Sequence, residues 1–115
     1  MATKDKPNIN QAELVRRWTE ELPRHLKNQD AIEVLADQAN PTRLLVSIVS
    51  DRREKFEFDF IIQYMDSREI KIELADFERA GKEANERHDT VQELIAEYRR
   101  SMHECAQALQ AYTHT

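Results

Sequence analysis

The sequence predicts one α+β domain, an α-β-β-β-β-α chain with a four-stranded antiparallel meander and a long C-terminal helix. Two observations predict this class. Residues 31–74 largely alternate apolar and polar side chains, with the period of two that is typical of strands. The flanking segments repeat their apolar residues every three to four positions, as amphipathic helices do.

The first helix is expected from Gln11 to about Lys27. Asn10 is a suitable N-cap, and Glu13 three residues later makes an imperfect capping box. Pro23 lies inside the helical pattern, so we expect a break there. The apolar face comprises Leu14, Val15, Trp18, Leu22 and Leu26.

Four strands are expected around residues 32–36, 44–49, 55–64 and 70–74. The third shows the clearest alternation, with one face made of Phe56, Phe58, Phe60, Ile62 and Tyr64. The connections are too short for helical crossovers, so the strands must form an antiparallel meander in chain order.

The reverse face of this sheet is mixed. Strands three and four present charged residues there, whereas the other contributions are aliphatic: Leu35, Leu45, Val49 and Ile61. An antiparallel sheet can leave one face in water, but a patch of large aliphatic side chains on that face would favour a protein partner.

The last third of the chain, Leu74 to Tyr112, reads as one continuous helix. Its apolar and small residues alternate spacings of four and three, the period of a packing seam: Phe77, Gly81, Ala84, His88, Val91, Ile95, Tyr98, Met102, Cys105, Leu109 and Tyr112. Such a helix would run roughly 55 Å, whereas a seven-residue strand spans about 23 Å. The alternative is two helices that meet near His88, because Asp89 precedes the capping box Thr90-Val91-Gln92-Glu93.

The overhang of this helix predicts an interface. Small residues in the first half of the seam suit its own sheet, and larger residues in the second half suit a second chain. The predicted interface comprises Val91, Ile95, Tyr98, Met102, Leu109 and Tyr112 of the helix, with Leu45, Val49 and Ile61 of the sheet. The alternative is that the first helix covers the second half of the seam within the monomer.

Composition narrows the functional class. The 115 residues are enough for one domain, which we place at residues 10–115 after a disordered tail of residues 1–9. The net charge of −5, with interleaved acids and bases, argues against nucleic acid, and a single glycine argues against Gly-rich phosphate loops. A lone cysteine, Cys105, and the lack of a long apolar run favour a soluble cytoplasmic protein that does not enter a membrane.

Few residues suggest chemistry. His103 and Cys105 are two apart on a helix and point away from each other, so no metal site is expected. Glu57 and Asp59 would lie about 7 Å apart on one strand face, where charge pairing with the fourth strand is the simpler explanation. We expect those cross-strand partners to be Lys71 and Glu73. No catalytic, cofactor-binding or metal-binding residue is predicted.

Two functional hypotheses follow. The first is a non-enzymatic protein-interaction module, a homodimer or a subunit with a protein partner, acting as an adaptor, a chaperone-like protein or an assembly subunit. The second is a small-molecule-binding or enzyme domain. Its pocket would lie between the sheet and the helices, lined by Trp18, Phe56, Phe58, Tyr64 and His88.

Overall fold

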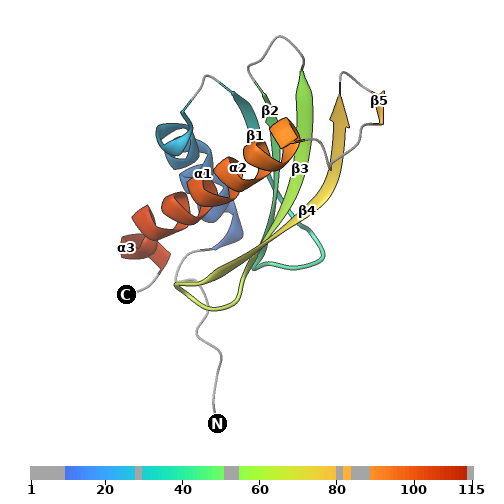
Figure 1. Ribbon diagram of the computed structural model, residues 1–115. Coiled ribbons are helices and arrows are strands. Elements are labelled where there is room, and N and C mark those ends of the chain that lie inside the picture. Colours follow the sequence, from blue (N-terminus) through green and yellow to red (C-terminus); the bar gives the residue numbers. More distant parts are fainter. Residues whose placement is uncertain (1–9, 28–29, 51–54, 80–81, 84–88, 114–115) are drawn as a thin grey trace.

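The computed structural model describes residues 10–27, 30–50, 55–79, 82–83 and 89–113 (Figure 1). The predicted tail of residues 1–9 lies outside them. The predicted α+β class is confirmed. The elements are α1 (Gln11–Glu21), the 3-10 helix η1 (Leu22–His25), β1 (Ala31–Ala36), β2 (Arg43–Val49), β3 (Phe56–Tyr64), β4 (Ile70–Arg79), β5 (Lys82–Glu83), α2 (Asp89–Ala108) and α3 (Gln110–Thr113).

The first helix forms and breaks where the sequence predicts. The Asn10 side chain accepts a hydrogen bond of 2.8 Å from the N–H of Glu13, which satisfies one free donor at the helix start. Pro23 lies in the first turn of η1, where its missing N–H costs nothing. The chain therefore changes from α to 3-10 geometry at this residue without losing its helical course.

The sheet is antiparallel, in the order β1-β2-β3-β4-β5. The meander of the first four strands is thus confirmed, and the short fifth strand was not predicted. As expected, the aromatic face of β3 is buried, from Phe56 through Phe58 and Phe60 to Tyr64. Helices α1 and α2 cover this face (Figure 1).

The predicted start of the C-terminal helix is wrong. Residues 74–79 belong to β4, and α2 begins only at Asp89, beside the capping box. The reason is a β-bulge: Leu74 pairs with Phe60 and Asp76 with Asp59, so Ala75 is an extra residue. The bulge shifts the alternation by one, and Leu74 and Phe77 then share a face at a helix-like spacing of three. Gly81, Ala84 and His88 lie outside the described residues.

This correction removes the predicted overhang. The 20 residues of α2 span about 30 Å, and the nine residues of β3 also span about 30 Å. Helix α2 lies across the inner face of the sheet (Figure 1). The sheet and α1 can cover the apolar side of α2 within one chain.

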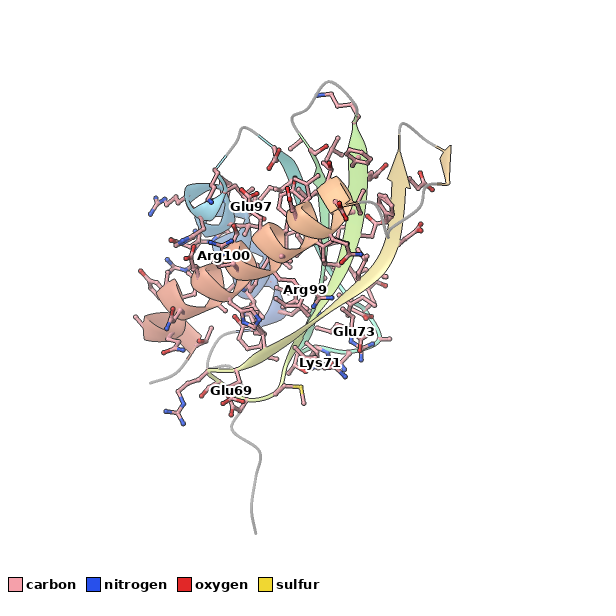
Figure 2. The ribbon with its side chains drawn as sticks, viewed as in Figure 1. Glu69, Lys71, Glu73, Glu97, Arg99 and Arg100 are labelled. Carbon is pink, nitrogen blue, oxygen red and sulfur yellow. The ribbon has the colours of Figure 1, made fainter. Side chains whose placement is uncertain are left out.

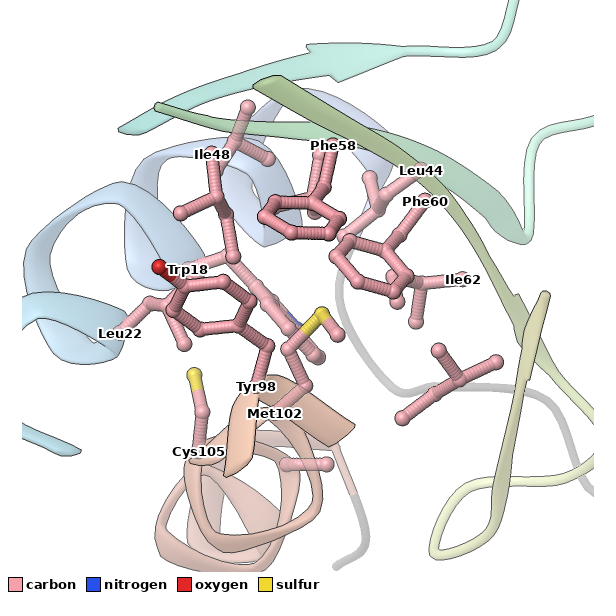
Figure 3. Close-up of a cluster of buried hydrophobic side chains, with 14 of the residues drawn as sticks. Trp18, Leu22, Leu44, Ile48, Phe58, Phe60, Ile62, Tyr98, Met102 and Cys105 are labelled. Carbon is pink, nitrogen blue, oxygen red and sulfur yellow. The ribbon is translucent and has the colours of Figure 1, made fainter. Parts of the chain in front are cut away.

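The core between the sheet and the helices is rich in aromatic rings (Figure 3). The ring of Tyr98 from α2 stands edge-on to Phe58, with centroids 5.3 Å apart. Phe58 in turn stacks on Phe77 across β3 and β4, also at 5.3 Å. These geometries are the favourable ones for aromatic quadrupoles, so they add to the energy of burial.

Two buried polar side chains connect the layers. The Nε1–H of Trp18 donates to the hydroxyl oxygen of Tyr64 at 3.0 Å. Burial raises the pKa of Tyr64 to about 12, although the Trp18 hydrogen bond opposes this shift. Burial also raises the pKa of the Cys105 thiol, and the charge of Glu21 adds to the effect. Cys105 is therefore a small neutral core residue and not an activated nucleophile.

Candidate interaction surface

The structure divides the predicted interface between the core and the surface. The helix residues Val91, Ile95, Tyr98, Met102 and Leu109 are buried within the monomer. They are already covered by their own chain and do not line an exposed surface here. Tyr112 is 42% exposed, and its ring lies 3.9 Å from the guanidinium carbon of Arg17.

The outer face of the sheet, opposite α1 and α2, holds the remaining predicted residues. We call it the open face. The register places Leu35, Leu45 and Ile61 side by side across β1, β2 and β3, and this set is the apolar row. Leu35 is 48% exposed, and Leu45 and Ile61 are half-buried. Val49 is separated from the apolar row by Ser47, whose hydroxyl donates to Asp59 at 2.6 Å.

A basic row borders the apolar row on one side. It consists of Arg43 on β2, Gln63 on β3 and Lys71 on β4, which are adjacent in the register. The Nε–H of Arg43 donates to Gln63 at 3.1 Å, and Arg43 also lies 3.6 Å from Asp37. Lys71 lies 3.3 Å from Glu73. The two cations are therefore held on the face, at one end of the strands.

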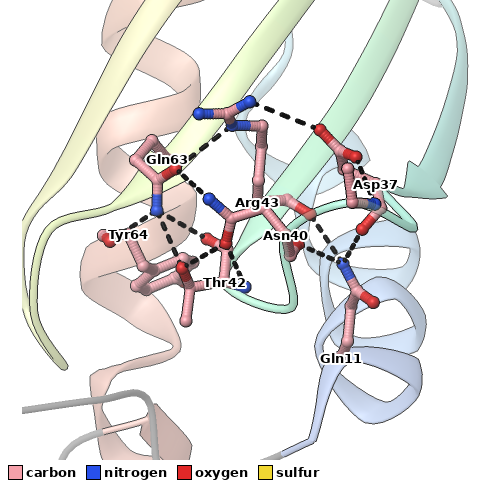
Figure 4. A network of polar contacts seen from close by, with 8 residues as sticks. Gln11, Asp37, Asn40, Thr42, Arg43, Gln63 and Tyr64 are labelled. Atoms are coloured by element: carbon pink, nitrogen blue, oxygen red, sulfur yellow. Dashed lines mark hydrogen bonds and ion pairs between the residues drawn. The ribbon is translucent and has the colours of Figure 1, made fainter.

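A polar network fixes this end of the sheet (Figure 4). The Gln63 amide donates to the hydroxyl of Thr42 at 2.8 Å, and the Asn40 amide donates to Gln63 at 3.1 Å. The two N–H groups of the Gln11 amide on α1 are shared among three carbonyl oxygens around the β1–β2 turn, those of Asp37, Asn40 and Arg43, each 2.9 Å from Nε2. The network binds α1, β2 and β3 together and orients Arg43.

The other end of the open face is acidic, and here the predicted pairing is wrong. Glu57 pairs with Glu78 and Asp59 with Asp76, whereas Lys71 pairs with Gln63 and Glu73 with Ile61. The cause is the extension of β4 to Arg79, which places further acids opposite the start of β3. With Glu33 on β1, the described side chains at this end include five carboxylates, and we call them the acidic rows: Glu33, Glu57, Asp59, Asp76 and Glu78.

The residues considered for chemistry do not form a site within the described part of the chain. Trp18, Phe56, Phe58 and Tyr64 pack into the core instead of lining a pocket, and His88 lies outside the described residues. Among the described residues, no three His, Cys, Asp or Glu side chains gather closely enough to hold a metal ion. His103 is exposed and Cys105 is buried, as expected from their opposite directions on α2.

Sequence reasoning missed one residue at the edge of the sheet. Arg99 of α2 extends to β4, where its Nη1 donates to the carbonyl oxygen of Ile72 at 2.7 Å (Figure 2). The signal was present in the spacing, because Gln92, Ile95 and Arg99 lie three and four residues apart and form one helix stripe. The sequence alone did not show that this stripe faces a strand edge.

Comparison of the chain with protein-family models, curated proteins and solved structures found no match. Functional inference therefore depends on the geometry of this chain alone. Among the described helices, none has the length and apolar character needed to cross a bilayer.

Proposed function

We propose that this chain is a small non-enzymatic protein-interaction module that forms a homodimer through the open face of its sheet. The observation that carries the proposal is the apolar row. Leu35, Leu45 and Ile61 form a continuous strip on a face that no described element covers. A cytoplasmic adaptor, chaperone-like protein or assembly subunit would use such a surface.

The size of the open face suits a weak dimer. Four strands about 4.8 Å apart, each contributing about seven residues, give a footprint of about 450 Å² per copy. Two copies would bury about 900 Å² or more, near the lower limit for specific interfaces. We therefore expect a dissociation constant of about micromolar or weaker.

The charge pattern favours a second copy as the partner. A two-fold axis that runs along the apolar row would place this row on itself and reverse the strand direction. The basic row of one copy would then face the nearer acidic row of the other, with Lys71 over Asp76 and Gln63 over Asp59. Glu73, which continues the apolar row on β4, would face its own counterpart in the other copy, where Lys71 at 3.3 Å offsets its charge. An axis parallel to the strands would instead place acidic rows on acidic rows, and like charges would oppose that arrangement.

The first test measures the mass of the protein by light scattering and analytical ultracentrifugation between about 1 and about 500 µM. We expect a concentration-dependent monomer–dimer equilibrium that Ile61→Lys abolishes, because the new charge would lie on the partner's apolar row. Ala12→Lys, on the exposed side of α1, is the matched control and should dimerise normally. A wild-type protein that stays monomeric throughout, or an Ile61→Lys variant that dimerises as before, overturns the proposal.

A charge-exchange experiment tests the direction of the axis. Lys71→Glu alone should weaken the dimer by acid–acid repulsion, and Asp76→Lys alone should weaken it by base–base repulsion. An equimolar mixture should form a heterodimer, because both contacts then join opposite charges. A dimer that is indifferent to both single changes would reject this axis while leaving the open face as the interface.

A further inference from the structure

The outer edge of β4 presents main-chain groups that none of the described strands pairs. Its neighbour β5 is joined only at Glu78 and Arg79. The carbonyl of Ile72 points away from β3, because Arg99 donates to it from outside the sheet at 2.7 Å. Along a strand, the N–H and C=O of one residue point the same way and those of the next residue point the opposite way. Ile70 and Leu74 therefore also present their main-chain groups at this edge.

An independent contact supports this assignment. The N–H of Tyr64 donates to the carbonyl of Thr42, on the β2 side, at 3.0 Å. Tyr64 is the register partner of Ile70, so this pair does not exchange hydrogen bonds between β3 and β4. The groups of Ile70 must consequently face outward, in phase with those of Ile72.

A groove of about 560 Å³ lies along this edge, between β4 and α2. Its apolar lining comes from Ile72, Leu74 and Ile95, and its polar lining comes from Glu73, Gln92 and Arg99. Figure 2 shows Arg99 between the helix and the strand, with Glu73 close by on β4. The site thus combines a free strand edge, an apolar wall and a guanidinium group.

Arg99 uses one of its hydrogen-bond donors within the described part of the chain. A guanidinium has five N–H donors, and the Ile72 carbonyl occupies one of them. Within the described residues, no carboxylate lies within ion-pair distance of Arg99, and the nearby Glu73 pairs with Lys71 at 3.3 Å. A carboxylate that entered the groove could accept a two-pronged hydrogen bond from the free donors.

We propose that this groove binds an extended, acid-bearing peptide segment of a partner protein, which adds to β4 as a further strand. Main-chain pairing with Ile70, Ile72 and Leu74 supplies sequence-independent affinity. An acidic side chain of the segment, pointing into the groove, binds the guanidinium of Arg99. The Ile72 carbonyl is then released from Arg99 and can accept a hydrogen bond from the added strand. The exposed edge of β4 extends on both sides of Ile72, to Ile70 and to Leu74. The bound segment can therefore continue past Arg99 in both directions, and its acidic group is a side chain and not a chain terminus. This site is separate from the open face and does not depend on dimerisation.

The probe is the capped hexapeptide acetyl-Val-Thr-Glu-Thr-Val-Thr-amide, which places valine, glutamate and valine on one side. Amide chemical shifts of the protein are followed by NMR as peptide is added to about 5 mM, which detects even millimolar binding. We expect saturable shifts at the amides of Ile70, Ile72 and Leu74. The same peptide with glutamine in place of glutamate should bind about three- to fivefold more weakly, as expected for a partly exposed ion pair.

Arg99→Gln should remove the preference for glutamate over glutamine and leave the main-chain contribution intact. Arg100→Gln changes the neighbouring, exposed arginine and is the matched control. Absence of shifts at the three amides up to that concentration, or equal binding of the two peptides to the wild-type protein, overturns the proposal. The comparison of peptides on the wild-type protein decides the matter even where Arg99→Gln fails to fold.

Discussion

Met102→Ala tests whether α2 is covered by its own chain. Met102 is fully buried, and Figure 3 shows it pointing from α2 toward the sheet. The change removes three buried side-chain atoms and leaves a cavity, at an expected cost of about 2–4 kcal/mol of unfolding free energy. A domain of this length has a stability of about 6–17 kcal/mol, so the variant should still fold.

The assay is urea unfolding followed by the fluorescence of Trp18, the single tryptophan, which is fully buried. Both the wild-type sequence and Met102→Ala are measured in the Ile61→Lys background, so that dimerisation through the open face does not contribute. We expect the same loss of free energy at about 1 and about 100 µM protein. His103→Ala, at the adjacent exposed position, should stay within about 0.5 kcal/mol of its parent.

The result that would refute this reasoning is a loss below about 1 kcal/mol. A loss that appears only at high concentration would refute it as well. The first outcome would mean that Met102 is not tightly packed in the monomer core, and the second would mean that it contacts a second chain in solution, as the sequence pattern first predicted. The seam of α2 would then be an interface and not a part of the monomer core.

Three further predictions concern the sheet and its supports. Phe58→Ala should lower the unfolding free energy by about 3–5 kcal/mol in urea melts, because Phe58 is fully buried. Glu57→Ala should be neutral or slightly stabilising, because Glu57 is paired with another glutamate, and the reverse ranking would mean that the strand register is wrong. Burial raises the pKa of both Cys105 and Tyr64, so unfolding free energy should fall as pH rises above 9.0, where the unfolded thiol begins to ionise. Cys105→Ala should reduce this fall by up to about 1.4 kcal/mol per pH unit, and identical slopes in the two proteins would contradict the assignment. Gln11→Ala should cost about 0.5–1.5 kcal/mol, because the carbonyl groups of Asp37, Asn40 and Arg43 lose the amide but keep their backbone N–H donors, and an unchanged melt would show that water replaces the amide.

The fold could be predicted from the sequence wherever one local rule acted alone. Asn10 and Pro23 fix the start and the break of the first helix through capping and a missing N–H. The strict alternation from Phe56 to Tyr64 fixes which face of β3 is buried. Short connections then permit only an antiparallel meander.

The prediction failed where two periods overlap. The extra residue Ala75 brings Leu74 and Phe77 to the same face of β4 at a spacing that also fits a helix. Hydrophobic periodicity cannot distinguish a bulged strand from the first turn of a helix, because both can place apolar residues three positions apart on the same face. The capping signal at Asp89 was the better guide, since it marks a helix start by hydrogen bonding and not by hydrophobic pattern.

That one bulge changes the functional inference as well as the topology. With the strand extended to Arg79, α2 is about as long as strand β3, and its apolar side is buried in the core. The same extension brings Asp76 and Glu78 opposite Asp59 and Glu57, which creates a strongly acidic end on the open face. The surfaces that we propose for partners are therefore those of the sheet. Its face has an apolar row between opposite charges, and its β4 edge has the guanidinium of Arg99 beside it.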